Sequence, residues 1–405
     1  MLTFRWESEF KETEIGEIPK DWNVKKLYEI VKDSIVGSTP LKRNSKFWQN
    51  GTIPWLTNKE VEYGQINYIY YTEEKVSDVA LKETNLKLLP VDSLILSFTA
   101  SVGKVAINKI PITTNQQFIS FILKDGFNVV YYAYYFILSK ELIESYSGAT
   151  PFSFITKESA LTIPVPYPSQ SEQKCIAMVL SWLDDLIENK KRQNEVLEKT
   201  AMAIFKSWFM DFEPFKDEEF VDSPLGKIPK GWDIRELGNV VKILYGEGLP
   251  ERKRQEGPYP VIGSSGIIGY HSKYLVYAPS IVVGRKGNVG SIFLMLEPSF
   301  PIDTVFYTSP DTPSELVFYV YHFLKNTSLE EIASSHTAVP GLDIHILNSL
   351  KLPFPPEPII QKFQSLVEPL FQKILLNQKE IMILRRVRDT LLSLLVFGEL
   401  RVEEI

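Results

Sequence analysis

The side chains of this 405-residue chain that could do chemistry are cations, amides and hydroxyls gathered in a few loops. In the major groove of DNA, Arg and Lys pair with guanine edges, whereas Asn and Gln pair with adenine edges. Lysines at loop ends also suit phosphate contacts. We predict DNA contacts by Lys42, Arg43, Lys46, Lys59, Lys104, Asn115, Gln116, Gln117, Arg252, Lys253, Arg254, Ser264, Ser265, Lys273, Arg285, Lys286 and Asn288. Each residue alone could equally be a solvated loop side chain, so the prediction rests on the clusters.

Groups that usually carry catalysis are sparse in this sequence. The four histidines have no spacing typical of metal ligands, and Cys175 is the single cysteine. Residues 263–269 are rich in glycine, but they lack the dinucleotide-binding pattern. Glu-x-Lys triplets at 73–75 and 172–174 could belong to a nuclease, although such triplets are common by chance. We therefore predict no catalytic residue and no metal site in this chain.

Charge and hydropathy restrict the setting in which the chain works. Its formal net charge is −6, which taken alone disfavours a nucleic-acid binder, because phosphate contacts need cations. A local basic face or a cationic partner could offset that charge. No stretch is apolar enough for a signal peptide or a membrane span, and the single cysteine fits a reducing compartment. We expect a cytoplasmic protein without membrane contact.

The chain repeats itself. Residues 15–31 and 225–241 align without a gap and share seven identities, including one matched pair of tryptophans. Further matching stretches follow in the same order: 37–40 with 246–250, 102–107 with 289–294, and 161–166 with 350–355. Between these stretches the two halves diverge. Two similar frames with dissimilar inserts suggest two reading heads with different targets, although duplication could also merely build a symmetric scaffold.

A long helical segment follows each repeat. Residues 169–210 contain neither Pro nor Gly, and both segments carry apolar residues in the alternating spacing of four and three that is typical of coiled coils. Polar residues interrupt the seam at Lys190, Asn194, Asn377 and Arg388, and Pro369 predicts a kink or a late start of the second helix. Antiparallel pairing of the two helices is expected, and each could also bind a partner protein. The seam residues are Leu180, Leu183, Ile187, Leu197, Ile204, Val367, Leu370, Ile374, Ile381, Leu384 and Leu391.

The remaining segments predict an α+β fold. Alternating and continuous apolar runs indicate strands near 93–98, 103–107, 118–123, 280–284 and 291–296, and helices at 129–138 and 314–325. We expect two pseudo-repeated α/β globular domains separated by two long antiparallel coiled-coil helices. The predicted order is a first recognition domain, a central helix, a second recognition domain and a C-terminal helix, at residues 1–167, 168–213, 214–357 and 358–405.

These motifs together resemble the specificity subunits of Type I restriction–modification enzymes. Residues 169–174, 183–190, 197–198 and 205–215 are similar to that family's central helical region. The two openings, Ile18-Pro-Lys-x-Trp22 and Ile228-Pro-Lys-x-Trp232, resemble the starts of its two target-recognition domains. The resemblance covers the whole chain in order. It is weaker at the second helix, where residues 358–361 replace the Ser-Glu-Gln of 171–173.

The resemblance implies a function without catalysis in this chain. Each recognition domain would read one half of a bipartite site in double-stranded DNA, and the helices would set the spacer between the halves. Two modification (methyltransferase) subunits would dock on the helices, bind S-adenosylmethionine and methylate adenine. Two restriction (motor–nuclease) subunits could join and use ATP with Mg²⁺. This chain would bind no cofactor itself. The alternatives are a DNA methyltransferase or nuclease with its own active site, and a coiled-coil adaptor that does not bind DNA.

Overall fold

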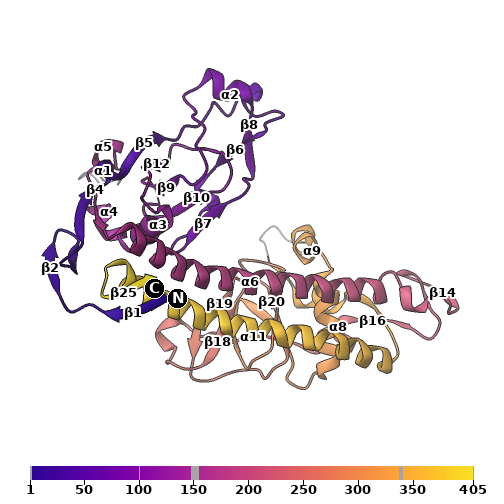
Figure 1. The fold of residues 1–405 in the computed structure, drawn as a ribbon. Helices are drawn as coiled ribbons and strands as arrows, with labels where there is room; N and C mark the ends of the chain where they lie inside the picture. The colour runs from indigo at the N-terminus through magenta and orange to yellow at the C-terminus, as the bar shows by residue number, and fades with distance from the viewer. Residues whose placement is uncertain (1, 100, 147–154, 337–340, 405) are drawn as a thin grey trace. The chain divides into compact units, whose positions relative to one another are not determined.

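The computed structural model describes residues 2–99, 101–146, 155–336 and 341–404. The chain forms two compact units: unit 1 comprises Met1–Ile187 with Ile383–Ile405, and unit 2 comprises Glu188–Met382. Two 40-residue helices, α6 (Gln170–Phe209) and α11 (Glu357–Val396), contribute one end to each unit (Figure 1). No helix of the described residues is long and apolar enough to cross a membrane.

Unit 1 is built on a five-stranded sheet of strand order β5-β12-β9-β10-β7, in which only the β10–β7 pair is parallel. A smaller sheet, β11-β6-β8, lies beside it in the fold, and three strand pairs, β1–β25, β2–β3 and β4–β13, complete the unit. The sheet strands are β5 (Val31–Val36), β6 (Ile53–Leu56), β7 (Ile66–Ile69), β8 (Glu74–Val76), β9 (Leu94–Ser97), β10 (Val105–Asn108), β11 (Thr113–Thr114) and β12 (Phe118–Leu123). The paired strands are β1 (Leu2–Trp6), β2 (Phe10–Thr13), β3 (Gly16–Pro19), β4 (Asn23–Lys26), β13 (Pro164–Tyr167) and β25 (Leu400–Glu404). Its short helices are α1 (Leu27–Ile30), α2 (Asp78–Glu83), α3 (Val129–Leu138), α4 (Lys140–Ser145) and α5 (Lys157–Leu161), with 3-10 turns η1 (Ser45–Phe47) and η2 (Asn58–Glu60).

Unit 2 has the same plan with fewer strands. Its larger sheet has the order β17-β23-β20-β21 and its smaller sheet the order β19-β18-β22, with the pairs β14–β15 and β16–β24 beside them. The strands are β14 (Phe220–Ser223), β15 (Gly226–Pro229), β16 (Asp233–Glu236), β17 (Ile243–Tyr245), β18 (Tyr259–Gly263), β19 (Gly266–His271), β20 (Ser280–Gly284), β21 (Ile292–Met295), β22 (Phe300–Pro301), β23 (Val305–Thr308) and β24 (Lys351–Phe354). The helices are α7 (Leu237–Val240), α8 (Ser314–Lys325), α9 (Leu329–His336) and α10 (Ile344–Asn348), with η3 (Glu213–Phe215) and η4 (Glu251–Lys253).

The duplication predicted from the sequence recurs in the hydrogen bonds of the two units. The amide of Gly37 donates to the carbonyl of Phe118 (3.0 Å), and the amide of Gly246 donates to that of Val305 (3.1 Å). Both positions need glycine, because a Cβ at Gly37 would lie 1.9 Å from a main-chain oxygen and one at Gly246 would lie 2.0 Å from another. The two matching Gly-to-Pro stretches therefore hold the same place in two copies of one frame.

Each unit buries an aromatic core under its repeat-opening tryptophan. Trp22 packs in unit 1 with the tyrosine-rich helix α3, and Trp232 packs in unit 2 with α8. The predicted helices at 129–138 and 314–325 coincide with α3 and α8. Their apolar runs begin directly after Asn128, whose side chain caps α3, and after Pro313, so the local signals and the tertiary packing agree.

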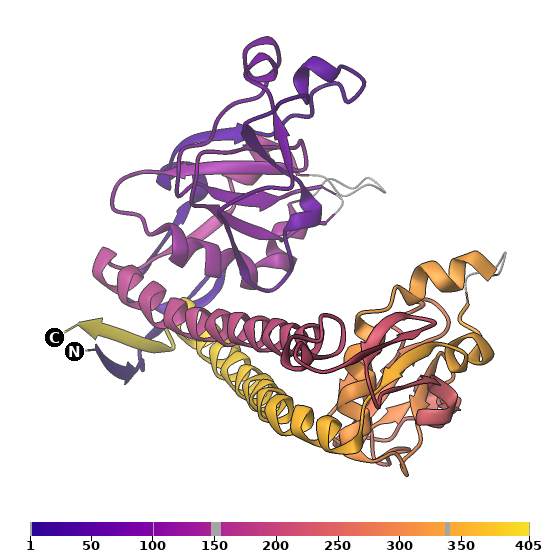
Figure 2. The ribbon, with the colours of Figure 1, turned by 90° about the vertical axis from the view of Figure 1, so that its right-hand side faces the viewer.

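The long helices pack against each other within each unit, as the seam spacing predicted (Figure 2). In unit 1, Ile176 and Leu180 near the start of α6 share a core with Leu392 and Leu395 near the end of α11. In unit 2, Phe205 near the end of α6 shares a core with residues near the start of α11, among them Phe363 and Val367. The two helices therefore run antiparallel.

The second long helix differs from its prediction at both ends. It has no late start: α11 begins at Glu357 and continues through Pro369, because exposed Pro369 lies beside buried Val367 and Phe371, which hold the helix to the core. The prediction of helix up to residue 405 is wrong. The helix ends at Val396, Gly398 adopts a φ of +78°, and the chain then forms β25 against β1.

Candidate DNA interface

The first cluster of predicted DNA-contacting residues in unit 1 surrounds two tryptophans. The ammonium of Lys42 lies 3.7 Å from the ring centroid of Trp48 and 4.5 Å from that of Trp55, and it forms an ion pair with Glu74. Lys46 is exposed and pairs with Glu83 at 2.8 Å. Because exposed ion pairs are weak, a phosphate could replace these carboxylates at little cost. Arg43 is exposed and pairs with no acidic group among the described residues.

The second cluster in unit 1 collects at the ends of β6 and β11. Asn115 is buried, and its side chain holds Gln117 by two hydrogen bonds of 3.0 Å, so it shapes the loop instead of facing solvent. Gln116, between them, is exposed and bonds to Thr39. Lys59 is exposed on η2, and Lys104 donates to the carbonyl of Asn58 (2.8 Å) in the same turn. The loops that follow β6, precede β10 and follow β11 are distant in sequence and thus meet in the fold.

In unit 2, the Ser264–Ser265 turn meets the loop that follows β20. The hydroxyl of Ser291 donates to the carbonyl of Ser264 (2.6 Å), and the amide of Asn288 donates to the Ser264 hydroxyl (3.4 Å). Exposed Lys286 lies in this loop, beside half-buried Arg285. The structure therefore brings together five predicted residues: Ser264, Ser265, Arg285, Lys286 and Asn288.

Arg285 is held in place by its own unit. Its Nη1 donates to the carbonyl of Asp303 (3.1 Å), and its guanidinium carbon lies 4.9 Å from the ring centroid of Tyr245. The Nε atom is buried without a hydrogen-bond partner among the described residues. Stacking and one hydrogen bond fix the plane of the guanidinium, which pre-organises it for a bidentate acceptor such as a guanine edge.

The remaining predicted residues of unit 2 lie around η4 and after β19. Arg252 and Lys253 are exposed, whereas Arg254 is half-buried and donates from Nη1 to the carbonyl of Ile268 (2.7 Å). Lys273 is exposed. Among the described residues, no side-chain hydrogen bond or ion pair joins these four residues to the Ser264–Asn288 group.

The two units present loops of different sequence at the same place in the repeated frame. The amide of Phe98 donates to the carbonyl of Gln117 (3.0 Å), and the amide of Arg285 donates to that of Thr304 (3.0 Å). Arg285 therefore takes the position that Phe98 has in unit 1. Sequence reasoning missed Thr39, Tyr245 and Thr304, which touch the predicted residues. They lie next to the repeated Gly37 and Gly246 segments and the matching loops. This position in the sequence could have indicated them.

The groups that could have served catalysis have structural partners. The Glu172 carboxylate accepts a hydrogen bond from the Trp22 indole (3.0 Å) and forms an ion pair with Arg401, so this Glu-x-Lys triplet belongs to the core of unit 1. His322 is buried among aromatic rings. Within the described residues, no group of three or more His, Cys, Asp or Glu side chains could hold a metal ion.

Comparison with known proteins agrees with this arrangement of paired units and long helices. The family model described as "Type I restriction modification DNA specificity domain" matches residues 19–199 and 229–385, one stretch for each repeat. This chain belongs to that family. It is a DNA-recognition subunit and not the catalytic part of such a system, as the sequence predicted.

Individual relatives bear the same name. The chain is 40% identical to the Type I restriction enzyme MjaIX specificity subunit of Methanocaldococcus jannaschii, over 100% of this chain and 99% of that protein. It is 26% identical to the EcoprrI specificity subunit of Escherichia coli, over 78% and 79% of the two chains. In fold it is similar to the crystal structure of the S subunit from M. genitalium, with a TM-score of 0.61, 19% identity and 93% and 96% coverage.

Proposed function

We propose that the chain reads a bipartite DNA site, with the loops of unit 1 on one half and those of unit 2 on the other. The observation that carries this proposal is one hydrogen-bonded frame that presents unlike loops twice, Gln116 with Thr39 in unit 1 and Arg285 with Lys286 in unit 2. Two related heads suit two half-sites of a duplex. Different side chains on the heads give different half-site sequences.

Exposed cations near these loops supply the attraction to phosphates. Six of the predicted cations are exposed and form no ion pair with a described residue: Arg43, Lys59, Arg252, Lys253, Lys273 and Lys286. Each cation that neutralises a phosphate releases a counterion, so such residues add affinity without reading sequence. The excess of acidic residues behind the net charge of −6 then lies on other surfaces, and cationic partner subunits add to the affinity for DNA.

We propose that α6 and α11 set the number of base pairs between the half-sites. Each helix has 40 residues, which corresponds to a length of roughly 60 Å at 1.5 Å per residue. Both helices contribute to both units, so a change in their length must change the separation of whatever the units bind.

Two modification subunits are the partners proposed for the outer faces of the helices. In unit 1, Trp182, Leu186 and Ile383 are half or more exposed, and in unit 2 Val196 and Met382 are exposed to a similar degree. Contiguous apolar side chains exposed on a helix mark protein contact. We assign S-adenosylmethionine to the modification subunits, and ATP with Mg²⁺ to restriction subunits where these are present. Such a complex would act in the cytoplasm.

Reconstitution tests this function. The full chain and the modification subunit encoded with it are incubated with a randomised DNA library, and methylated adenines are mapped. We expect a two-part motif with a fixed spacer, and no methyl transfer by either protein alone. Exchange of residues 285–288 for those of a relative should change one half of the motif. A contiguous motif, or methylation by this chain alone, would refute the proposal.

A further inference from the structure

The two copies of the frame differ at one sheet edge. In unit 1, β6 is followed by residues 57–73, which form η2 and β7 before the chain returns as β8. In unit 2, only Ser264 and Ser265 separate β18 from β19. The strand β7, which pairs with β10 in parallel in unit 1, therefore has no counterpart. Among the described residues, no strand pairs with the outer edge of β21, the equivalent of β10.

The equivalence of β10 and β21 rests on hydrogen bonds. The amide of Ser97 donates to the carbonyl of Lys104 just before β10 (3.0 Å), and the amide of Gly284 donates to that of Ser291 just before β21 (2.7 Å). Val105 then turns its carbonyl outward, where it accepts a hydrogen bond from the side-chain Nδ2 of Asn67 of β7 (2.9 Å). By the same alternation, Ile292 and Leu294 turn their main-chain groups toward the open edge of β21.

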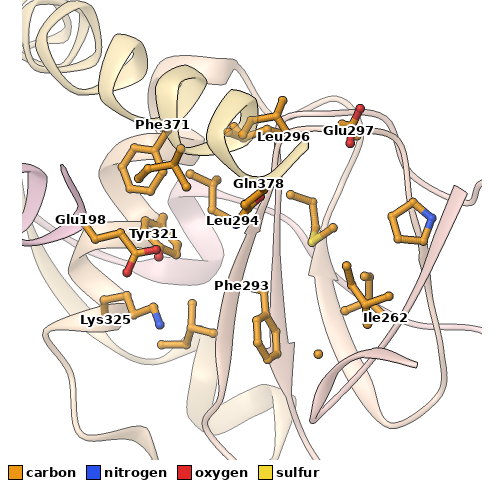
Figure 3. Close-up of a pocket in the computed structure, with 17 residues that line it drawn as sticks. Glu198, Ile262, Phe293, Leu294, Leu296, Glu297, Tyr321, Lys325, Phe371 and Gln378 are labelled. Atoms are coloured by element: carbon orange, nitrogen blue, oxygen red, sulfur yellow. The ribbon is translucent and has the colours of Figure 1, made fainter. Parts of the chain in front are cut away.

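The open edge faces an apolar hollow. A cavity of about 290 Å³ is lined by residues of β21, α6, α8, α11 and the β18–β19 hairpin, among them Leu294, Tyr321 and Phe371 (Figure 3). All of β10 is buried, whereas Phe293, Leu294 and Met295 of β21 are partly exposed. An exposed edge strand with apolar side chains invites pairing with another strand.

The chemistry of the hollow selects a peptide and excludes nucleic acid as its occupant. Of the lining residues, the three charged ones are Glu198, Lys325 and Glu297, and Glu297 is paired with Lys379 at 2.6 Å. The surface between them is more apolar than polar, which suits a strand with apolar side chains better than a phosphate backbone. The strand β7 shows what fits such a place: Ile66 and Ile69 are buried, and Asn67 bonds to the neighbouring strand.

We propose that a strand of the modification subunit adds to the edge of β21 in the parallel sense, in the place that β7 fills in unit 1. This inference rests on the proposed function, which supplies that subunit as the partner. Strand addition supplies main-chain hydrogen bonds for affinity and a side-chain pocket for selectivity. The strand would lie beside Ile262 and Gly266, which flank the Ser264–Ser265 turn, and would thus stiffen the recognition loops of unit 2.

Residue-resolved hydrogen exchange of the full chain, alone and in complex with the modification subunit, tests the inference. The amide hydrogens of Ile292 and Leu294 should exchange at least about tenfold more slowly in the complex than in the chain alone. Leu294→Pro removes one outward N–H and should weaken complex formation by about tenfold, whereas the matched Leu294→Ala keeps the N–H and should retain most of the affinity.

The outcomes separate this inference from the proposed function. If the helices become protected and DNA is methylated while Ile292 and Leu294 exchange as before, the strand addition is wrong and the proposed function stands. If no complex forms with the modification subunit, both fail. Should Leu294→Pro not fold, as judged by its thermal unfolding, the exchange measurement on the unaltered chain still decides.

Discussion

Asn377 of α11 donates a hydrogen bond from Nδ2 to Oδ1 of Asn194 of α6, 2.8 Å away, inside the seam of unit 2. The Asn377 side chain is fully buried, and its Oδ1 lies 3.4 Å from the ammonium of Lys190, which also forms an ion pair with Glu380. A polar pair inside an apolar seam costs stability, but it is satisfied in only one register of the two helices. Three of the four polar residues that interrupt the seam are thus paired with one another, and the fourth, Arg388, is not among them.

Substitution of this pair should reveal its role in register. Asn377→Leu leaves the amide of Asn194 without its partner and should lower the free energy of unfolding by about 1–3 kcal/mol. The double variant Asn194→Leu/Asn377→Leu should recover most of that loss, because no polar group then remains unpaired. Chemical denaturation measures both, with exposed Ser365→Ala as the control on the same helix. A double variant as unstable as the single one would show that the pair contributes stability itself.

Arg401 anchors the last strand of unit 1 through ion pairs with two buried carboxylates and one exposed carboxylate. Its guanidinium contacts Glu7 (2.6 Å), Asp21 (2.9 Å) and Glu172, and the side chain is 4% exposed. Arg401→Met would leave the Glu172 carboxylate buried without a cation and should cost about 3–5 kcal/mol of unfolding free energy. Arg5→Met removes the ion pairs of a guanidinium that is itself exposed and should cost about 1 kcal/mol or less. Equal losses for the two variants would contradict the assignment.

His322 makes the stability of unit 2 depend on pH. Burial lowers the pKa of His322 to about 4 from its ordinary value of 6.5, so the folded state holds the ring neutral. Between these values the unfolded chain binds a proton that the folded chain does not. Stability should therefore be unaffected above pH 6.5 and fall as the pH drops toward 4, by about 1 kcal/mol for each pH unit.

Denaturation at several pH values checks this expectation. His322→Phe, which keeps the aromatic packing with Phe205 and Phe363, should flatten the decline between pH 6.5 and 4. His345→Gln, at an exposed position, should leave the decline as it is. An unchanged slope in His322→Phe would mean that another group carries the pH dependence.

Two neighbouring residues of the loop after β20 should have different roles, one in reading a base and one in contacting a phosphate. Arg285→Ala should cost about 1–3 kcal/mol of DNA binding by the complex and relax one half-site only. Lys286→Ala should weaken binding equally on all sequences. It should also reduce the slope of log affinity against log salt concentration by about one. Lys227→Ala, an exposed cation outside the predicted clusters, is the matched control. If all three variants bind as the unaltered complex does, the adaptor without DNA contact becomes the better description.

Local signals decided which parts of this molecule could be predicted from the sequence. The helices α3 and α8 and the strands β12 and β20 were predicted with their observed bounds, because caps and apolar runs agree with their packing. The pairing of the two long helices followed from the seam spacing, which does not by itself give their direction. The strand β25 was missed, because its residues pair with β1 at the opposite end of the sequence, and such pairing leaves no local pattern.

The candidate site was predictable as clusters but not as contacts. Asn115 and Gln116 are adjacent in sequence, yet the first is buried in the loop and the second is exposed. Nothing in their types distinguishes them, because the difference lies in their contacts: the Asn115 side chain bonds to Gln117 within the loop, whereas Gln116 bonds to Thr39 of another segment. Arg285 likewise looked like a free cation, and its stacking on Tyr245 depends on the pairing of β17 with β23.

The length of the paired helices gives the sharpest test of the spacer. One heptad inserted in α6 after Glu188 and one in α11 before Met382 keeps the alternating seam and adds about 10 Å to each helix. Since base pairs rise about 3.4 Å along the duplex, the preferred spacer should grow by about three base pairs. Methylation of DNA libraries with variable spacers measures it. A heptad in α6 alone is the control and should abolish activity, because the two helices then differ in length. Unchanged spacing after the paired insertion would show that the helices do not set the distance.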